Sequence, residues 1–273
     1  MPPSTFFPEP HALDVGALSD AGTERGINED HCATLIDGST SALVVVADGV
    51  SGAEGGDTAS RTAVESLLLA YREQPSTIPS AKRLYRAAQR ANIAVYDLAL
   101  VVPELRGMST TLTALSIDRG ELSTVHVGDS RLYLIRSGRV QQLTKDHTVT
   151  AARTRLGLLS KQRARTHKDR STLTRSLGRD LVASLDRITT RVEQGDMLIA
   201  CSDGLYNVLD EKHMAELVGD LDATAACRAL VDRANQRGTP DNLTAAVVRI
   251  VGATPVPPRR SLLAAALSRL SRG

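Results

Sequence analysis

Apolar residues follow two periods along the chain, and segments of each period alternate in blocks. Short apolar runs bounded by turn residues predict strands at 12–18, 32–36, 43–47, 110–117, 121–127, 131–136, 197–201 and 243–251. Apolar residues three and four positions apart predict helices at 56–73, 80–100, 211–218 and 223–237. Blocks of strands that alternate with pairs of helices predict an α+β fold of antiparallel sheets flanked by helices, not a doubly wound parallel sheet.

Aspartates stand where several of these apolar runs meet a turn. Asp48, Asp129 and Asp203 follow a run, Asp241 precedes one, and a further acidic motif covers 28–30. Strands that deliver carboxylates to one rim concentrate negative charge, which protons or cations must neutralise. Hard oxygen ligands with few His or Cys residues nearby favour Mg²⁺ or Mn²⁺ over zinc.

The composition of the chain limits the classes of function that the protein can have. Hydrophobic residues make up 42% and charged residues 23% of 273 residues, which is ordinary for a soluble globular protein. Aromatics at 3% and a net charge of +2 argue against a nucleic-acid partner. Three cysteines suit a reducing compartment without a disulfide framework. With neither a signal peptide nor an apolar run long enough for a transmembrane segment, we expect a cytoplasmic protein.

Proline-rich segments mark the limits of the expected domain. Residues 1–10 are expected to form a disordered leader, and residues 253–273 to form a Pro-rich breaker with a short basic tail. The sequence between them shows no repeat and no linker, so we expect one domain over 11–252.

Five motifs occur in one order along this domain. They are Ser19-Asp20-Ala21-Gly22 with Arg25 to Asp30, Val46-Ala47-Asp48-Gly49, Gly128-Asp129-Ser130, Ser202-Asp203-Gly204 and Pro240-Asp241-Asn242. Together they resemble the metal-dependent Ser/Thr protein phosphatases of the PPM (type 2C) family, in particular its bacterial members. The resemblance implies a four-layer α-β-β-α sandwich with two antiparallel sheets flanked by helix pairs. It also implies hydrolysis of phosphoserine and phosphothreonine by a metal-activated water, without a covalent intermediate.

The resemblance further implies a role for each matching acidic position. Asp48 would bridge two Mg²⁺ or Mn²⁺ ions, and Gly49 would add its backbone carbonyl. Asp203 and Asp241 would bind one of the two ions, while Glu29 would support the other through a water.

Further roles concern the surroundings of that pair. Asp129 would join Asp203 at a third metal site. Asp30 and Asn242 would lie behind the ligands, with Asp30 holding waters and neighbouring groups in place. Arg25 would hold the phosphoryl oxygens, because a guanidinium matches two of them with its planar fork. Arg25 and Asp48 are therefore the expected catalytic pair.

Two features depart from this pattern or leave it open. Val50 stands where some family members carry a histidine that is proposed to protonate the leaving oxygen, and valine cannot donate a proton. Residues 145–179 correspond to the family's mobile flap, and the basic residues from 153 to 179 are accompanied by Asp169 as the only acidic residue before Asp180. This flap either attracts acidic phosphorylated segments or is simply a solvated helix pair.

The expected partners are phosphorylated proteins and a cognate Ser/Thr kinase, and the expected state is a monomer. Two other functions stay open. One is a pseudophosphatase that binds phosphoproteins without catalysis, against which the intact acidic ligand set and Arg25 argue. The other is a two-metal hydrolase of small phosphomonoesters, which substrate profiling distinguishes.

Overall fold

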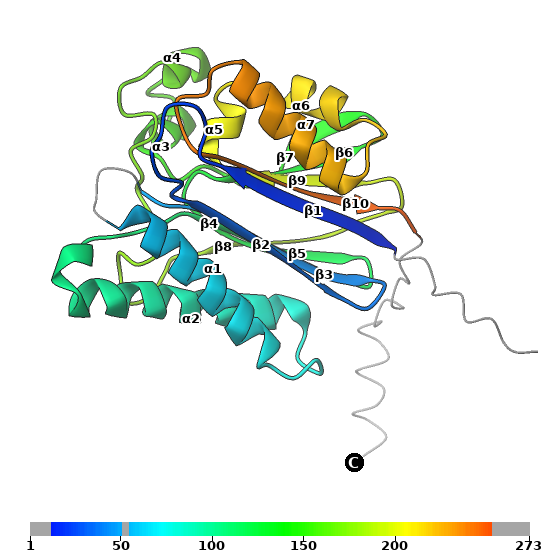
Figure 1. The fold of residues 1–273 in the computed structure, drawn as a ribbon, viewed down its shortest axis with the longest axis horizontal. Coiled ribbons are helices and arrows are strands. Elements are labelled where there is room, and N and C mark those ends of the chain that lie inside the picture. Colours follow the sequence, from blue (N-terminus) through cyan, green and yellow to red (C-terminus); the bar gives the residue numbers. More distant parts are fainter. Residues whose placement is uncertain (1–11, 51–54, 253–273) are drawn as a thin grey trace, which may run out of the picture.

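Two antiparallel sheets, each covered on its outer face by helices, stack against each other in the computed structural model (Figure 1). The structure describes residues 12–50 and 55–252. The expected four-layer α-β-β-α order is confirmed. The predictions for the leader at 1–10 and for the tail at 253–273 lie outside the described residues.

The first sheet, sheet A, is covered by α6 (Glu211–Val218) and α7 (Ala223–Gln236). Its strands are, in spatial order, β1 (Leu13–Asp20), β10 (Leu243–Ile250), β9 (Met197–Cys201), β6 (Arg131–Arg136) and β7 (Arg139–Gln142). A short helix, α5 (Asp203–Tyr206), follows β9 directly.

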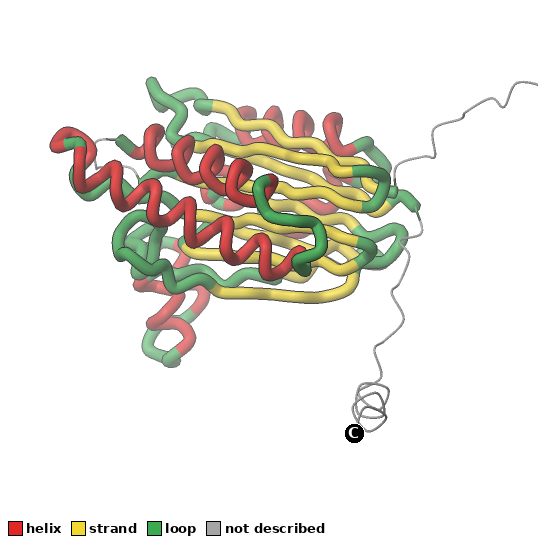
Figure 2. Tube along the Cα trace, turned by 90° about the horizontal axis from the view of Figure 1, so that it is seen from below, coloured by secondary structure: helices red, strands yellow, loops and turns green. Residues whose placement is uncertain are grey.

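The second sheet, sheet B, is covered by the two longest helices, α1 (Gly56–Arg72) and α2 (Ser80–Val101), as Figure 2 shows from below. Its strands are, in spatial order, β2 (Asp30–Asp37), β3 (Ser41–Asp48), β4 (Leu112–Asp118), β5 (Glu121–Val127) and β8 (Asp186–Arg191). A single 3-10 turn, Pro103–Leu105, follows α2.

The apolar run of β3 explains the central layers. Because side chains alternate across a strand, Val45 and Ala47 pack against α1 and α2, while Val44 and Val46 pack between the two sheets. All four side chains are fully buried, which stabilises the fold by roughly 1.5–3 kcal/mol for each valine. A strand that is buried on both faces needs a continuous apolar run, so the sequence identifies it readily.

Two strands, β7 (Arg139–Gln142) and β8 (Asp186–Arg191), were missing from the sequence prediction, and a helix pair in the flap was only one of two alternatives. β7 and β8 lie at the sheet edges, and in β8 half-buried residues alternate with exposed ones, so neither strand carries an apolar run. The polar stretch 145–179 contains α3 (Val149–Arg155) and α4 (Lys161–Arg165). Thr148 and Ser160 cap these helices by accepting from Ala151 N and Arg163 N.

Candidate metal centre

The polarity of the strands brings the five predicted aspartates to one end of the sandwich, where α5 lies in Figure 1. Asp30 opens β2 and pairs in register with Asp48 at the end of β3. Asp129 follows β5, Asp203 follows β9, and Asp241 precedes β10. We call these five residues the carboxylate end.

Desolvation and mutual repulsion act together on these groups. Loss of solvation raises the pKa of Asp48 well above its usual range, and the charges of Asp30, Asp203 and Asp129 raise it further. The pKa of Asp129 is raised by burial first and then by Asp203. The pKa of Asp203 is raised to about 6 by loss of solvation and then by repulsion from Asp241. Such a group of carboxylates favours the binding of protons or cations.

Asp30 is the most deeply buried of the five, with 2% of its surface exposed. Its Oδ2 accepts hydrogen bonds from Ser202 Oγ at 2.6 Å and from Thr244 Oγ1 at 2.7 Å. Its Oδ1 has no hydrogen-bond partner among the described residues. Burial is the main reason why its pKa is raised to about 7. One oxygen of a buried carboxylate is therefore left to accept from a further donor or from the water of a cation.

Asp241 makes a different contact. Its carboxylate lies 3.0 Å from Arg25 Nη2, and Arg25 Nε donates to the carbonyl of Pro240 at 3.3 Å. Across residues 12–50 and 55–252, no group of three or more His, Cys, Asp or Glu side chains is arranged to hold a metal ion. The side chains of Asp48, Asp203 and Asp241 thus share one end of the fold but do not close around one point.

Close backbone packing surrounds Gly49. Its N–H donates to the carbonyl of Glu29 at 3.0 Å, and a Cβ at this position would overlap the carbonyl of Gly56. The side chain of Glu29 lies against Gly56 at the start of α1, where a Cβ would collide with the Glu29 carboxylate. Only glycine fits at position 49, so the backbone carbonyl is the ligand that this position can offer.

Asn242 joins the loop before β2 to the segment that carries Asp241. Its Oδ1 accepts from Glu29 N at 2.9 Å, and its Nδ2 donates to the carbonyls of Ala21 and Ile27, both at 2.9 Å. The side chain is buried and uses both of its polar atoms. Asn242 therefore holds Glu29 and Asp241 in a fixed relation.

The donor chemistry of the carboxylate end fits Mg²⁺ or Mn²⁺. Asp48, Asp203, Asp241, Asp129 and the Gly49 carbonyl offer hard oxygen ligands. The thiol of Cys201 lies inside β9, and burial raises its pKa to about 12, so it is not a thiolate ligand. The uncompensated charge and the free Asp30 Oδ1 agree with this chemistry.

Sequence reasoning gave no role to several residues that surround the aspartates. The Arg131 guanidinium forms a bidentate pair with Asp146, at 3.0 and 2.7 Å, and lies 3.6 Å above the Tyr206 ring. Its positive charge lowers the pKa of both Asp129 and Asp203, which opposes the upward shifts. Arg131 directly follows the Gly128-Asp129-Ser130 motif, but its partners lie elsewhere in the sequence, so only the fold reveals its position.

Two hydroxyl groups contact the carboxylates or their backbone. Thr111 Oγ1 accepts from the backbone N–H of Asp48 at 3.0 Å, and Ser202 Oγ donates to Asp30. Both side chains are buried. They fix the orientation of the strand ends that carry the aspartates.

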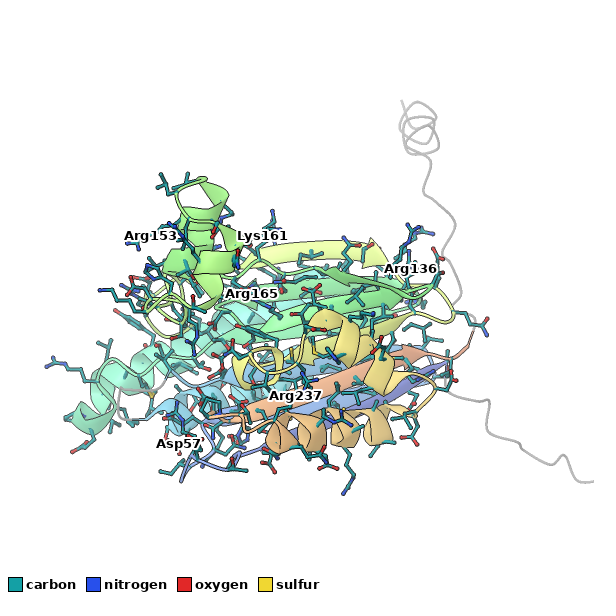
Figure 3. The ribbon with its side chains drawn as sticks, turned by 90° about the horizontal axis from the view of Figure 1, so that it is seen from above. Asp57, Arg136, Arg153, Lys161, Arg165 and Arg237 are labelled. Carbon is teal, nitrogen blue, oxygen red and sulfur yellow. The ribbon has the colours of Figure 1, made fainter. Side chains whose placement is uncertain are left out.

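The basic flap forms a projection beside the carboxylate end. Arg153, Lys161 and Arg165 lie on its helices α3 and α4 (Figure 3). Arg170, which follows α4, brings its charge near enough to Asp203 to oppose the rise of that residue's pKa. At least one flap cation therefore acts on the candidate metal centre.

Comparison with known proteins assigns this chain to a family. Residues 23–247 match the family model described as protein phosphatase 2C. The chain belongs to the protein phosphatase 2C family. The serine/threonine phosphatase stp of Listeria innocua is 31% identical over 234 residues, which cover 84% of this chain and 93% of that protein.

Solved structures of this family share the fold. The crystal structure of the Mycobacterium tuberculosis serine/threonine phosphatase PstP/Ppp superposes with a TM-score of 0.79 at 30% identity, covering 88% of this chain and 99% of that one. A structure of the PstP catalytic domain in complex with two manganese ions gives a TM-score of 0.77, at 30% identity, with the same coverage. The sequence predictions of a PPM-type serine/threonine phosphatase and of its fold are confirmed.

The sequence also raised the question of whether any helix of the chain could span a membrane. Of the helices in the described ranges, none is long and apolar enough to cross a membrane.

Proposed function

We propose that this phosphatase hydrolyses phosphoserine and phosphothreonine esters of proteins with a water activated at a binuclear Mg²⁺ or Mn²⁺ centre, without a covalent intermediate. The observation that carries the proposal is the carboxylate end, where desolvation and repulsion raise the pKa of Asp30, Asp48, Asp129 and Asp203. Two divalent ions, when bound, supply Lewis acidity and lower the pKa of a shared water.

Each acidic residue has a proposed place in this centre. Asp48 is the bridging ligand, Gly49 contributes its backbone carbonyl, and Asp203 and Asp241 bind one ion. Glu29 acts through a water on the other ion. In addition, Asp129 and Asp203 form a third, weaker site, as their mutual repulsion supports.

Arg25 is proposed to bind the phosphoryl group of the substrate. Its side chain is 38% exposed and is held beside Asp241 at the carboxylate end. A guanidinium keeps its charge at every relevant pH and can donate two parallel hydrogen bonds to phosphoryl oxygens. The contacts with Asp241 and the Pro240 carbonyl orient this fork.

Two neighbouring residues, Asp30 and Asn242, are proposed to position the ligands. Asp30 accepts from Ser202 and Thr244 through Oδ2, which fixes its carboxylate and leaves Oδ1 without a partner among the described residues. Asn242 keeps the Glu29 loop against the Asp241 segment. Groups that hold a ligand in this way typically change metal affinity or activity about 10–100-fold when replaced.

Val50 excludes one source of the leaving-group proton, because its side chain cannot donate. We therefore expect that the pH profile of kcat has no limb that titrates near the ordinary histidine pKa of about 6.5. A limb in that range, abolished by replacing His31, would contradict this proposal.

The basic flap is proposed to attract acidic, phosphorylated segments of substrates. Arg163 and Arg165 lie in the last turn of α4, on the same projection as the flap cations in Figure 3. Replacing both with Glu should raise KM for an acidic phosphothreonine peptide more than for an aryl phosphate. Equal effects on both substrates would indicate that the flap is only a solvated helix pair. Replacing Arg228, which is exposed on α7, with Glu is the matched control.

One experiment tests the proposed reaction. Hydrolysis of phosphothreonine peptides and of an aryl phosphate is followed with Mn²⁺, with a chelator, and in Asp203→Asn. We expect peptide hydrolysis that needs Mn²⁺ and falls steeply in the variant. Activity that survives chelation would contradict the mechanism, hydrolysis of only the aryl phosphate would indicate a small-molecule hydrolase, and binding without turnover would indicate a pseudophosphatase. A cognate kinase, a monomeric state and a cytoplasmic location remain predictions.

A further inference from the structure

A cavity of about 450 Å³ opens at the opposite end of sheet B from the aspartates. It lies between the β2–β3 turn, the β4–β5 turn and the C-terminal end of α1, and Leu35, Leu43 and Ile117 line it. This volume is in the range of pockets that enclose small molecules. Because its lining comes from strands and a helix, the cavity is part of the folded scaffold.

Three guanidinium groups line the cavity, those of Arg72, Arg83 and Arg119. Arg83 lies 4.1 Å above the Tyr71 ring, and its Nη2 donates to the Tyr71 carbonyl at 3.1 Å. Arg83 Nε is buried and has no hydrogen-bond partner within the described part of the chain. A buried charged donor without a partner is costly, and a negative group in the cavity beside Arg83 would offset the charge of its guanidinium.

Two carboxylates, Asp37 and Asp118, also line the cavity. Asp118 already accepts from Ser41 Oγ at 3.1 Å and from Arg119 Nε at 3.4 Å. With Asp118 and Arg119 paired, the remaining charged residues of the lining are Arg72, Arg83 and Asp37. The charge balance of the lining therefore favours a ligand with a negative group.

We propose that this cavity binds a small amphipathic anion. Its acidic head group, a carboxylate or a phosphate, contacts the exposed guanidinium of Arg72 and the part of Arg83 that lines the cavity. Its aliphatic or aromatic body lies on Leu35, Leu43 and Ile117. The combination of a few placed polar groups with an apolar floor is typical of ligand pockets.

The position of the cavity separates this proposal from the proposed reaction. β2 runs from Asp30 to Asp37 and β3 from Ser41 to Asp48, so the cavity and the carboxylate end lie at opposite ends of the same strands. A ligand in the cavity does not compete with a phosphoryl group beside Arg25. Its binding also needs no metal, so it is measured in the presence of a chelator.

The test uses octanoate and octylphosphonate, which carry the two kinds of acidic head group on one body, and neither is a phosphate ester that the enzyme could hydrolyse. Methyl chemical shifts of the full chain are followed by NMR with a chelator and inorganic phosphate present. We expect saturable shifts at Leu35, Leu43 and Ile117 with at least one probe. Octylamine, which has the same body and the opposite charge, and acetate, which has only the head group, should bind at least about tenfold more weakly.

Charge reversal identifies the residues that carry the binding. Arg72→Glu combined with Arg119→Glu changes two exposed side chains, and we expect it to weaken binding of the preferred probe at least about tenfold. Arg72→Gln with Arg119→Gln tests the same point if the reversed charges disturb folding. Arg228→Glu, on α7 in the other helical layer, should leave the affinity unchanged.

Three results would overturn the proposal. They are the absence of saturable shifts at the three cavity residues, octylamine binding as tightly as the anions, and unchanged affinity in both double variants. The preferred head group then distinguishes a carboxylate from a phosphate ligand. None of these results depends on the activity of the metal centre.

Discussion

The two ends of β9 present the same side chain in opposite surroundings. Asp196 precedes this strand, is 3% exposed, and accepts from Arg136 Nε at 2.8 Å, Arg136 Nη2 at 2.6 Å and Glu193 N at 2.8 Å. Asp203 follows the strand and accepts from Asn207 at 3.1 Å, and its pKa is raised to about 6. A carboxylate that serves the fold is neutralised by a guanidinium, whereas the carboxylate end is left with excess negative charge, which is available to bind cations.

The largest expected effect is a loss of kcat caused by a substitution within the carboxylate end. Asp48→Asn removes the carboxylate that is proposed to bridge two ions, and we expect kcat for a phosphothreonine peptide to fall about 1000-fold, because an interaction made mainly in the transition state is lost. Asp196→Asn should keep kcat within about threefold, because its partners lie at the other end of the strand. Steady-state kinetics with saturating Mn²⁺ measure both. Similar losses in the two variants would remove the distinction between the ends.

The second expected effect concerns stability. Asp196→Ala leaves Arg136 without its bidentate partner, and we expect the free energy of unfolding to fall by about 2 kcal/mol, since a charged hydrogen-bond pair is lost. The side chain of Arg136 is 38% exposed, so water offsets part of the loss. Urea unfolding followed by circular dichroism gives this value.

Asp203→Asn is the matched comparison in the same assay. In a chelator, removal of one negative charge from the carboxylate end should leave the free energy of unfolding unchanged or raise it. A loss in Asp203→Asn as large as that in Asp196→Ala would show that Asp203 is a structural carboxylate.

The third effect is a pH dependence. The pKa of Asp30 is about 7 and that of Asp203 about 6 in the folded chain, against the ordinary aspartate value of 3.8. Between those values the folded state binds more protons than the unfolded state, so the contribution of these two groups to stability is present at low pH and is lost as pH rises from about 4 to 7.

This dependence is measured as a difference between variants. In a chelator, the stability of Asp203→Asn relative to wild type should increase by at least about 1 kcal/mol from pH 4 to pH 7. Saturating Mn²⁺ should remove that difference, because bound cations favour the ionised carboxylates. A relative stability that stays constant or declines with pH would contradict the raised pKa of Asp203.

The smallest expected effect is a change in the pKa of Asp30. The Oδ2 of Asp30 accepts from hydroxyl groups, whereas Asp196 accepts from a guanidinium. Ser202→Ala removes one hydrogen bond that stabilises the ionised form, so the pKa of Asp30 should rise by less than about one unit. Carboxyl NMR titration in a chelator measures it, and Ser123→Ala, on a buried hydroxyl in β5 without a partner among the described residues, is the control. A lowered pKa would show that Ser202 does not support the charge.

Much of the fold was predictable because its central strands are buried on both faces. The apolar runs before Asp48, Asp129 and Asp203 identified strands, and antiparallel pairing brought their ends together. β8 was missed, since an edge strand with alternating exposed residues has no apolar run. Its recognition depends on pairing with β5, which the sequence does not reveal.

The placement of the acidic residues at one end of the fold was predictable from the sequence, whereas the contacts that the neighbouring cations make were not. Arg25 and Asp241 are separated by more than two hundred positions, and their ion pair follows from the approach of the β1–β2 loop to the start of β10. The influence of Arg170 on Asp203 depends on the position of the flap beside the carboxylate end. Local patterns predict strand ends, whereas contacts between loops follow from the complete topology.

Isothermal titration of the metal-free chain with Mn²⁺ at pH 6.5 tests most directly whether the carboxylate end binds cations. Two buffers with different ionisation enthalpies report the protons that are released. We expect at least two Mn²⁺ ions to bind, with release of protons from carboxyls whose pKa is raised, and both signals to weaken in Asp48→Asn and Asp203→Asn. Failure of the wild-type chain to bind Mn²⁺, or equal binding in both variants, would contradict the proposed metal centre.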